Sequence, residues 1–436
     1  MSSKTKTTSA MEDSTPVLVP KLRFPEFREA EGWESIPLNR LAVRAKQKNR
    51  SAQIDRVLTN SAEFGVVDQR DFFNKDIATQ GKLEGYFVVE FGSYVYNPRI
   101  SSAAPAGPIS KNKIGTGVMS PLYTVFKFKD DRNDFYEHFF KTTGWHTYMR
   151  QASSTGARHD RMAISSDDFM AMPLPVSSPD EQQKIADCLN LLDELIAAQG
   201  RKVDALKTHK KGLMHQLFPR EGETQPRLRF PEFQCAGEWD AYPFESFVAK
   251  SFYGTSSSTS PTGQYPVLRM GNMSDGGLDF TNLVYIDLDP DSFESFRLED
   301  GDILLNRTNS PALVGKVSLF GLKSECITAS YIVTYRLNKK RIDPAFCNFM
   351  LNTSLYQARI KKLAKPSISQ ANINPTTFKK ELVVSVPAVL EQQRIADCLT
   401  SLDELIGTQI QKLEAFKTHK KGLMQQLFPS MEVVEA

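Results

Sequence analysis

The chain has 436 residues, of which 40% are hydrophobic and 24% are charged, a composition typical of folded globular proteins. The net charge is only +3, so any nucleic-acid binding must rest on locally arranged cations and not on a polycationic chain. No apolar run reaches the roughly 18 residues of a membrane span, and the polar N-terminal segment lacks the apolar core of a signal peptide. We therefore expect a cytoplasmic protein of two domains that contacts no membrane, with a disordered tail over residues 1–19.

Residues 20–180 are predicted to form a first domain of mixed helix and sheet. The domain opens with the sequence Leu-Arg-Phe-Pro-Glu-Phe at residues 22–27. A helical stretch with aromatic anchors is predicted over residues 135–149. Alternating aromatic and β-branched residues predict strands over residues 85–96, 121–128 and 172–176.

Residues 181–219 are predicted to form one long helix of a coiled coil. Seam residues recur in alternating steps of four and three, the 3.5-residue period of supercoiled helices. The seam consists of Ile185, Leu189, Leu192, Ile196, Gln199, Val203 and Leu206. Pro219 ends the helix.

Residues 220–390 contain a linker and a second domain that repeats the order of the first. Leu-Arg-Phe-Pro-Glu-Phe recurs at residues 228–233, and a tryptophan follows at the same offset in each copy (Trp33 and Trp239). A helical stretch is predicted over residues 344–362. Strands are predicted over residues 265–270, 301–306, 330–337 and 382–387. The two domains otherwise differ in sequence, which predicts one fold with two different surfaces.

Residues 391–429 repeat the first helix without a gap, with 28 of 39 positions identical, and residues 430–436 are expected to be a tail. The second seam consists of Ile395, Leu399, Leu402, Ile406, Gln409, Leu413 and Phe416. We predict that the two helices pair antiparallel within one chain and bring Gln199 near Gln409, where an amide contact would fix the register. The alternative is that both glutamines reach water.

The expected fold is thus mixed α+β. Two α/β domains are separated by two long helices that form an antiparallel coiled coil, with a pseudo-twofold internal repeat. Lys210 and Lys420 interrupt the seam within a shared Thr-His-Lys-Lys-Gly run. We interpret them as a solvated face near the helix end, with a partner or DNA-backbone contact as the alternative.

Basic and amide side chains gather in the predicted loops of both domains. Arginine and lysine pair with guanine edges and phosphates, whereas asparagine and glutamine pair with adenine. Solvated surface is the plain alternative for each residue alone, but the set favours DNA contact. The candidates are Arg99, Lys111, Lys113, Arg158 and Arg161 in the first domain, and Arg307, Asn309, Lys361, Lys365 and Gln370 in the second.

The sequence contains no complete catalytic, cofactor or metal motif. Gly-Thr-Gly-Val at residues 115–118 lacks the third glycine and the following helix of a nucleotide loop. Asn-Pro-Arg-Ile at residues 97–100 lacks the second proline and the aromatic residue of the Asn-Pro-Pro-aromatic loop of amino-methyltransferases. The histidines and cysteines show no metal-ligand spacing. We therefore expect no catalytic residue, cofactor or metal in this chain.

The two Glu-Gln-Gln-[Lys/Arg]-Ile-Ala helices, the two Leu-Arg-Phe-Pro-Glu-Phe openings and the two variable segments resemble the specificity subunit of type I restriction–modification systems. The resemblance extends over residues 20–429. It implies that each variable segment is a target recognition domain that reads one half of an asymmetric bipartite site in double-stranded DNA. It also implies that the helices set the gap between the half-sites and dock modification subunits, of which we expect two.

The same resemblance implies that the chemistry resides in partners. Modification subunits would carry S-adenosylmethionine and methylate adenine, and restriction subunits would use ATP and Mg²⁺ to translocate and cleave DNA. Two other functions stay open. A self-contained DNA methyltransferase or nuclease would need a cofactor loop, and a non-enzymatic coiled-coil adaptor would leave two different strand-rich domains unexplained.

Overall fold

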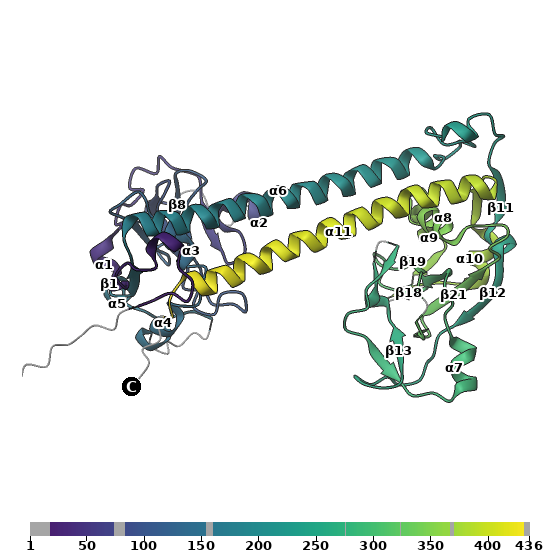
Figure 1. Cartoon of the computed structure of the whole chain (residues 1–436). Coiled ribbons are helices and arrows are strands. Elements are labelled where there is room, and N and C mark those ends of the chain that lie inside the picture. Colours follow the sequence, from purple (N-terminus) through teal and green to yellow (C-terminus); the bar gives the residue numbers. More distant parts are fainter. Residues whose placement is uncertain are drawn as a thin grey trace, which may run out of the picture. The chain divides into compact units, whose positions relative to one another are not determined.

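The computed structural model describes residues 18–73, 83–153, 160–274, 276–322, 324–366 and 370–430 (Figure 1). The chain divides into two compact units. Unit 1 consists of Met1–Ala198 and Leu413–Ala436, and unit 2 of Gln199–Lys412. The tails expected at the two ends of the chain lie outside the described residues, except for residues 18, 19 and 430. Leu18 exchanges backbone hydrogen bonds with Trp33.

Two long helices, α6 (Pro179–Leu217) and α11 (Val389–Leu427), contribute a segment to each unit. Contacts within unit 2 show that the helices are antiparallel, because Gln199 of α6 meets Gln409 whereas the later Lys210 meets the earlier Asp403. The seam residues Ile185, Leu189, Ile395 and Leu399 are all buried. The predicted antiparallel pairing of the two repeated helices is confirmed.

The glutamines in the seam form a direct contact. The Gln199 Nε2 atom donates to the backbone oxygen of Gln409 at 3.0 Å and to its Oε1 at 3.1 Å. Gln199 is only 7% exposed, so the alternative in which both glutamines reach water is wrong. A buried amide pair of this kind favours one helix register over its neighbours.

The interpretation of the seam lysines as a solvated face was wrong. Lys210 Nζ lies 2.6 Å from Asp403 Oδ1, and Lys420, which is 8% exposed, donates to Asp193 Oδ1. Burial lowers the pKa of Lys420, and the hydrogen bond to Asp193 opposes that shift. An ammonium group in an apolar seam requires a counter-charge, and in each unit an aspartate of the opposite helix provides it.

We predict that cysteines introduced at Gln199 and Gln409 form an intramolecular disulfide on mild oxidation, because these side chains are in contact across the seam. The exposed Cys235 is first replaced by serine to suppress chain-to-chain products. Non-reducing electrophoresis separates the two kinds of product. A control that pairs Gln199→Cys with a cysteine at the exposed Gln411 should crosslink much less. Formation of chain-to-chain products alone would contradict the pairing.

Unit 1 is built around a four-stranded antiparallel sheet in the order β2-β9-β6-β7. Its strands are β1 (Glu34–Pro37), β2 (Ala42–Arg44), β3 (Leu58–Ser61), β4 (Gly65–Asp68), β5 (Phe87–Val89), β6 (Tyr94–Tyr96), β7 (Ile109–Lys111), β8 (Gly117–Met119), β9 (Thr124–Phe128) and β10 (Pro173–Val176). Its short helices are η1 (Pro25–Phe27), α1 (Leu38–Leu41), α2 (Gln69–Phe73), α3 (Asp134–Phe139), α4 (His146–Ala152) and α5 (Ser166–Met170). Three further strand pairs, β1 with β10, β3 with β4 and β5 with β8, complete the unit.

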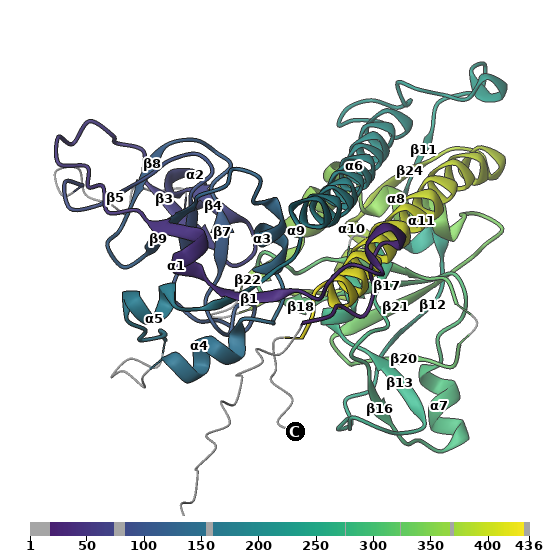
Figure 2. The ribbon, with the colours of Figure 1, turned by 60° about the vertical axis from the view of Figure 1, so that its left-hand side comes forward.

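Unit 2 repeats this plan with the four-stranded sheet β12-β21-β17-β19. Its strands are β11 (Asp240–Pro243), β12 (Val248–Tyr253), β13 (Tyr265–Leu268), β14 (Met273–Ser274), β15 (Gly277–Leu278), β16 (Val284–Ile286), β17 (Asp302–Asn306), β18 (Thr308–Asn309), β19 (Val317–Phe320), β20 (Ile327–Thr328), β21 (Ile332–Leu337), β22 (Ala364–Pro366), β23 (Ala371–Ile373) and β24 (Val383–Val386). Its short helices are η2 (Pro231–Phe233), η3 (Phe244–Phe247), η4 (Met270–Asn272), α7 (Pro290–Phe296), α8 (Pro344–Leu351), α9 (Ser354–Lys362) and α10 (Pro375–Glu381). Figure 2 shows α7 beside β13 and β16, where Phe293 stacks on Tyr265.

Strands occur in every predicted segment, but the segment 85–96 is two strands, β5 and β6, and each predicted helical stretch is two helices. In unit 1 the stretch divides into α3 and α4, which the segment Thr142-Thr143-Gly144 separates. In unit 2 it divides into α8 and α9, because the Thr353 side chain accepts from the backbone N–H of Tyr356 and so starts a new helix.

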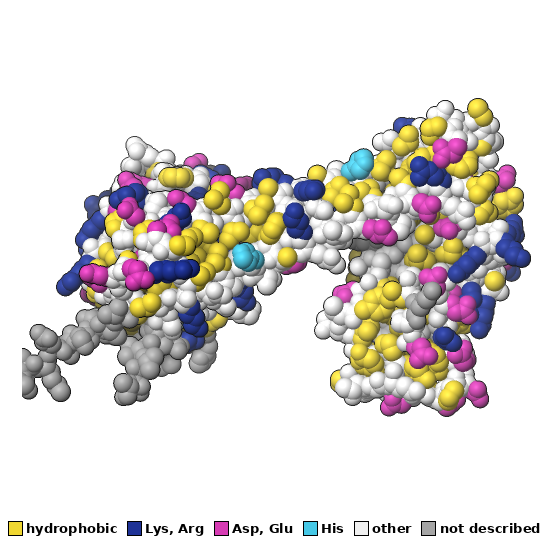
Figure 3. All heavy atoms as spheres, viewed as in Figure 1, with side chains coloured by type: hydrophobic (Ala, Val, Ile, Leu, Met, Phe, Trp, Pro, Cys, Tyr) yellow, Lys and Arg dark blue, Asp and Glu magenta, His cyan; other side chains and the backbone are white. Residues whose placement is uncertain are grey.

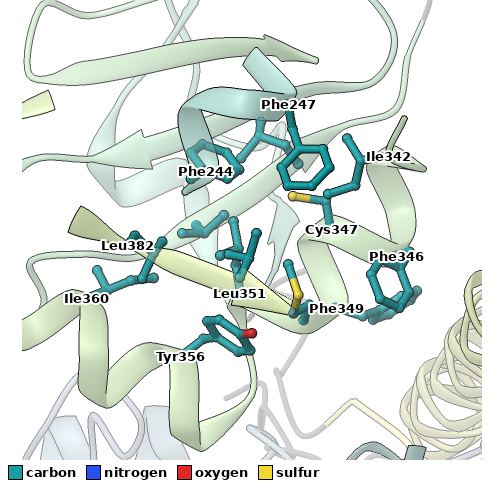
Figure 4. Close-up of a cluster of buried hydrophobic side chains, with 14 of the residues drawn as sticks. Phe244, Phe247, Ile342, Phe346, Cys347, Phe349, Leu351, Tyr356, Ile360 and Leu382 are labelled. Carbon is teal, nitrogen blue, oxygen red and sulfur yellow. The ribbon is translucent and has the colours of Figure 1, made fainter. Parts of the chain in front are cut away.

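The long helices belong to the core of each unit. In unit 2, Phe346 and Met350 of α8 pack in one buried cluster with Ile395 and Leu399 of α11. Figure 4 shows part of this cluster, in which aromatic and aliphatic side chains of α8, α9 and η3 face one another. In unit 1, the cluster of Trp33 and Phe135 likewise includes Leu189 of α6 and Leu427 of α11.

The repeated Leu-Arg-Phe-Pro-Glu-Phe segments join each unit to the start of a long helix. Arg23 donates from Nε and Nη2 to both carboxylate oxygens of Glu181, at 2.7 and 2.8 Å. Arg229 makes the same two contacts with Glu391, at 2.8 and 2.7 Å. Both glutamates are 1% exposed. Two arginine–glutamate pairs therefore explain why these two distant motifs occur together in each repeat.

Candidate nucleic-acid interface

In unit 1, the residues after β6 form a short backbone contact with a segment far along the chain. Arg99 pairs with Arg161 in an isolated antiparallel bridge. Two backbone hydrogen bonds hold it: Met162 N to Pro98 O at 2.9 Å and Ile100 N to Asp160 O at 3.1 Å. Arg99 is exposed and Arg161 is half-buried. Arg158, another predicted DNA contact, lies outside the described residues.

In unit 2, the residues after β17 form the corresponding contact. Thr308 of β18 lies opposite Asn372 of β23, and Ile373 N donates to Arg307 O at 2.8 Å. The Thr308 hydroxyl donates to Asn372 Oδ1 at 2.5 Å. Both of these side chains are half-buried at the surface.

The two contacts occupy the same place in the repeated fold. Each preceding strand follows a glycine with positive φ, Gly92 at 80° and Gly301 at 91°. Five residues later comes an asparagine whose backbone N–H donates to the neighbouring strand segment, from Asn97 to Pro108 O and from Asn306 to Lys316 O. Position by position, Arg99 and Arg161 of unit 1 therefore correspond to Thr308 and Asn372 of unit 2. We call these two positions the cross-strand pair.

The second-domain candidates converge on the small sheet β18-β23-β22. Asn309 lies opposite Ala371, and Lys365 lies opposite Asn372. Gln370 immediately precedes β23, and Lys361 lies near the end of α9, which leads into β22. Lys361, Lys365 and Gln370 are exposed. Residues predicted by type and loop position thus lie in or beside one small sheet of unit 2, although the strand alternation places Asn309 and Lys365 on opposite faces of it.

Arg307, which precedes β18, is positioned by an aromatic ring. Its guanidinium carbon lies 5.3 Å from the ring centre of Tyr253, within the range of a cation–π contact. Its buried Nε atom has no hydrogen-bond partner among the described residues. Stacking of this kind fixes the plane of the guanidinium group and leaves its terminal nitrogens available as donors.

The first-domain lysines lie elsewhere in unit 1. Lys111 Nζ is 2.6 Å from Asp134 Oδ1, and Lys113 Nζ is 2.7 Å from Glu137 Oε2. Both acids belong to α3, so these lysines stabilise the packing of β7 and its loop against that helix. The structure brings Arg99 and Arg161 together but does not bring the two lysines to them.

A surface cavity of about 460 Å³ surrounds the arginine pair of unit 1. Besides Arg99 and Arg161, its lining includes the aromatic residues Phe72, Phe73, Tyr86 and Tyr123. Phe72 and Phe73 are each 41% exposed, unusual for phenylalanines side by side on a short helix. Sequence reasoning missed these residues, although two adjacent phenylalanines flanked by Asp71 and Asn74 are a visible signal.

The cross-strand positions of unit 2, Thr308 and Asn372, were also missed. A signal existed in the shared spacing of Gly92 to Asn97 and Gly301 to Asn306, which aligns the two loops without a structure. On the face drawn in Figure 3, lysine and arginine side chains are interspersed with acidic ones, in keeping with the small net charge.

The described residues show neither a candidate metal site nor a membrane-spanning helix. Within the described ranges, no group of three or more histidine, cysteine or acidic side chains is arranged to hold a metal ion. None of the helices in those ranges combines the length and the apolar character needed to cross a membrane.

Comparison with known proteins finds one matching family model and several similar proteins. The model of the "Type I restriction modification DNA specificity domain" matches residues 246–415. The putative type I restriction enzyme MjaX specificity subunit of Methanocaldococcus jannaschii is 34% identical over 166 residues, which span 38% of this chain and 39% of that protein. The MjaVIII specificity subunit of the same organism is 23% identical over 331 residues, 73% of this chain and 74% of that protein.

A solved structure has the same fold along the whole chain. The S subunit of a type I restriction–modification system from M. genitalium aligns with a TM-score of 0.57 at 13% identity, covering 95% of this chain and 100% of that one. The repeated helices, the repeated arginine–glutamate joins and these comparisons agree: the chain has the fold of a type I restriction–modification S subunit, and residues 246–415 match the family model of its DNA specificity domain.

Proposed function

We propose that this chain is the specificity subunit of a type I restriction–modification system and recognises an asymmetric bipartite DNA site, of which each unit reads one half. One observation carries the proposal. The two units share one backbone plan and nearly identical joins to the long helices, yet their cross-strand pairs carry different side chains. One backbone fold that occurs twice with different surface side chains suits a protein whose two units read two different DNA sequences.

The partners follow from the same proposal. Two modification subunits would carry S-adenosylmethionine and methylate adenine, and restriction subunits would supply ATP- and Mg²⁺-dependent translocation and cleavage. This chain would contribute recognition without catalysis. The long helices offer two equivalent surfaces for docking, because Leu195 and Leu405 occupy the same position of the repeat and are each 43% exposed. Exposed leucines on a helix face favour contact with another protein.

The test is to express the chain with its cognate modification subunits in a host without adenine methylation and to map N6-methyladenine in the genome. We expect methylation at one bipartite motif, and its loss when this chain is omitted. Methylation by the chain alone would support the self-contained enzyme. Unchanged methylation in its absence would support the adaptor.

We predict that Arg307→Ala relaxes recognition of one half-site only, since Arg307 lies wholly within unit 2. A lost base contact costs about 1–3 kcal/mol against the wrong base. Methylation profiling on a library with both half-sites randomised measures the effect. Arg297→Ala serves as the control, because Arg297 belongs to the same unit but forms an exposed ion pair with Glu294. Equal loss at both half-sites would contradict one reader per unit.

A further inference from the structure

We propose that the cross-strand pair selects one base in each half-site: Arg99 with Arg161 recognises a guanine, and Thr308 with Asn372 recognises an adenine. This inference rests on the proposed function, since it assigns bases to the two readers. It concerns the two positions that the repeated fold places opposite each other in both units.

The two side chains of a cross-strand pair can reach the same base pair. Residues directly opposite in an antiparallel pair have Cβ atoms about 4.5–5.5 Å apart. In each unit one member of the pair comes shortly after the strand that begins after the positive-φ glycine, and backbone pairing holds it opposite the other member. The shared backbone therefore holds two side chains close enough to contact the same base pair.

The arginine pair is not required by the fold. Like charges directly opposite each other destabilise a strand pair. Within the described ranges, Arg161 forms an ion pair with Asp160, at 3.8 Å and 56% exposed, and Arg99 forms none. Unit 2 forms the same backbone contact with the neutral pair Thr308 and Asn372. Because the neutral pair suffices for the frame, the two charges in unit 1 point to a ligand.

The chemistry of each pair matches a different base. Guanine presents two acceptors in the major groove, N7 and O6, which arginine donors satisfy in pairs. Adenine presents the N7 acceptor beside the N6 donor, which one asparagine amide matches. The Thr308 hydroxyl fixes Asn372 through Oδ1. The amide then retains its Nδ2 donors and one Oδ1 lone pair for the base.

The surroundings of each pair agree with this role. In unit 1, the pair lies at the cavity lined by Phe72, Phe73 and Tyr123, which gives room for a base edge against apolar walls. In unit 2, the exposed Lys365 lies opposite Asn372 and can hold the phosphate backbone while the amide reads the base.

The test exchanges the pairs within the full complex of this chain and its modification subunits. Arg99→Thr with Arg161→Asn should move the preference at one position of one half-site from guanine to adenine. Thr308→Arg with Asn372→Arg should make the opposite change in the other half-site. A good base contact discriminates by about 1–3 kcal/mol, so the preference should change by about 5- to 150-fold. The readout is methylation of a library with both half-sites randomised.

Controls separate the possible outcomes. Arg132→Ala removes another exposed arginine of unit 1 and should leave the motif unchanged. If circular dichroism shows that the variant Arg99→Thr with Arg161→Asn does not fold, the exchange Thr308→Arg with Asn372→Arg and the single variant Arg99→Lys still test the assignment. Weaker binding to all sequences, with a salt slope smaller by about one per arginine, would mean phosphate contacts and overturn it. An unchanged motif would also overturn it. Absence of any bipartite motif with the unaltered chain would refute the proposed function instead.

Discussion

Replacing Glu391 with alanine is expected to lower the free energy of unfolding of unit 2 by about 3 kcal/mol. Both carboxylate oxygens accept from Arg229, and the Arg229 side chain is only 8% exposed. Removing the carboxylate leaves a guanidinium group held under the surface with only the carbonyls of Ala236 and Gly237 as partners. Breaking one side of a buried pair costs about 3–5 kcal/mol, and we take the lower end because the pair lies close to the surface.

Urea unfolding of the full chain measures this loss, and hydrogen exchange resolved by peptide mass spectrometry locates it in unit 2. Glu181→Ala should produce a similar loss in unit 1, because Arg23 makes the same contacts there. Arg394→Ala is the matched control. Its ion pair with Glu232 is about half exposed on both sides, so the loss should stay below about 1 kcal/mol. A Glu391→Ala chain as stable as the control would contradict the structural role of the joins.

The long helices could be predicted because their signal is local. A 3.5-residue period and a terminal proline are visible in a single segment, and the repeat of that segment suggested its partner. The role of Lys210 and Lys420 could not be predicted in the same way. Each lysine is paired with an aspartate of the opposite helix, and the match depends on the register of an antiparallel pair.

The candidate interface shows a similar division between local and non-local information. Residue type and loop position selected Arg307, Asn309, Lys365 and Gln370, which the structure places in or directly beside one small sheet, and their contact with DNA stays a prediction. The same two criteria could not reveal the ion pairs of Lys111 and Lys113, because the acidic residues of α3 that pair with them come from a later segment. The cross-strand pair required knowledge of strand pairing over some sixty residues, which no local pattern records.

His138 is expected to make unit 1 less stable as the pH falls below about 6.5. The ring is fully buried, and its Nε2–H donates to Asn190 Oδ1 at 2.9 Å. Burial lowers the pKa of His138 to about 4, the bond to Asn190 opposes the shift, and Lys141 and Lys420 add to it. In the unfolded chain the pKa is about 6.5. Between these values the unfolded state binds a proton that the folded state does not, so stability falls as the pH decreases.

The loss at pH 4 should be on the order of 3 kcal/mol relative to pH 7, since each unit of pKa difference corresponds to about 1.4 kcal/mol. Unit 2 supplies a matched replacement. Trp33 packs on Phe135 as Trp239 packs on Phe346, and three residues later His138 corresponds to Phe349. Thr400 holds the place of Asn190 in the repeated helix. The double variant His138→Phe with Asn190→Thr therefore copies a packing that the same fold already accommodates.

Urea unfolding at pH 7, 6, 5 and 4.5 compares the variant with the unaltered chain. The variant should lose the decline between pH 6.5 and 4, whereas the exposed His209 of α6, replaced by phenylalanine, should leave it unchanged. Ion-paired carboxylates, including Asp193, retain their own dependence at lower pH because the pKa of Asp193 is lowered. Parallel curves for the variant and the unaltered chain would show that His138 is not the group whose protonation unfolds unit 1.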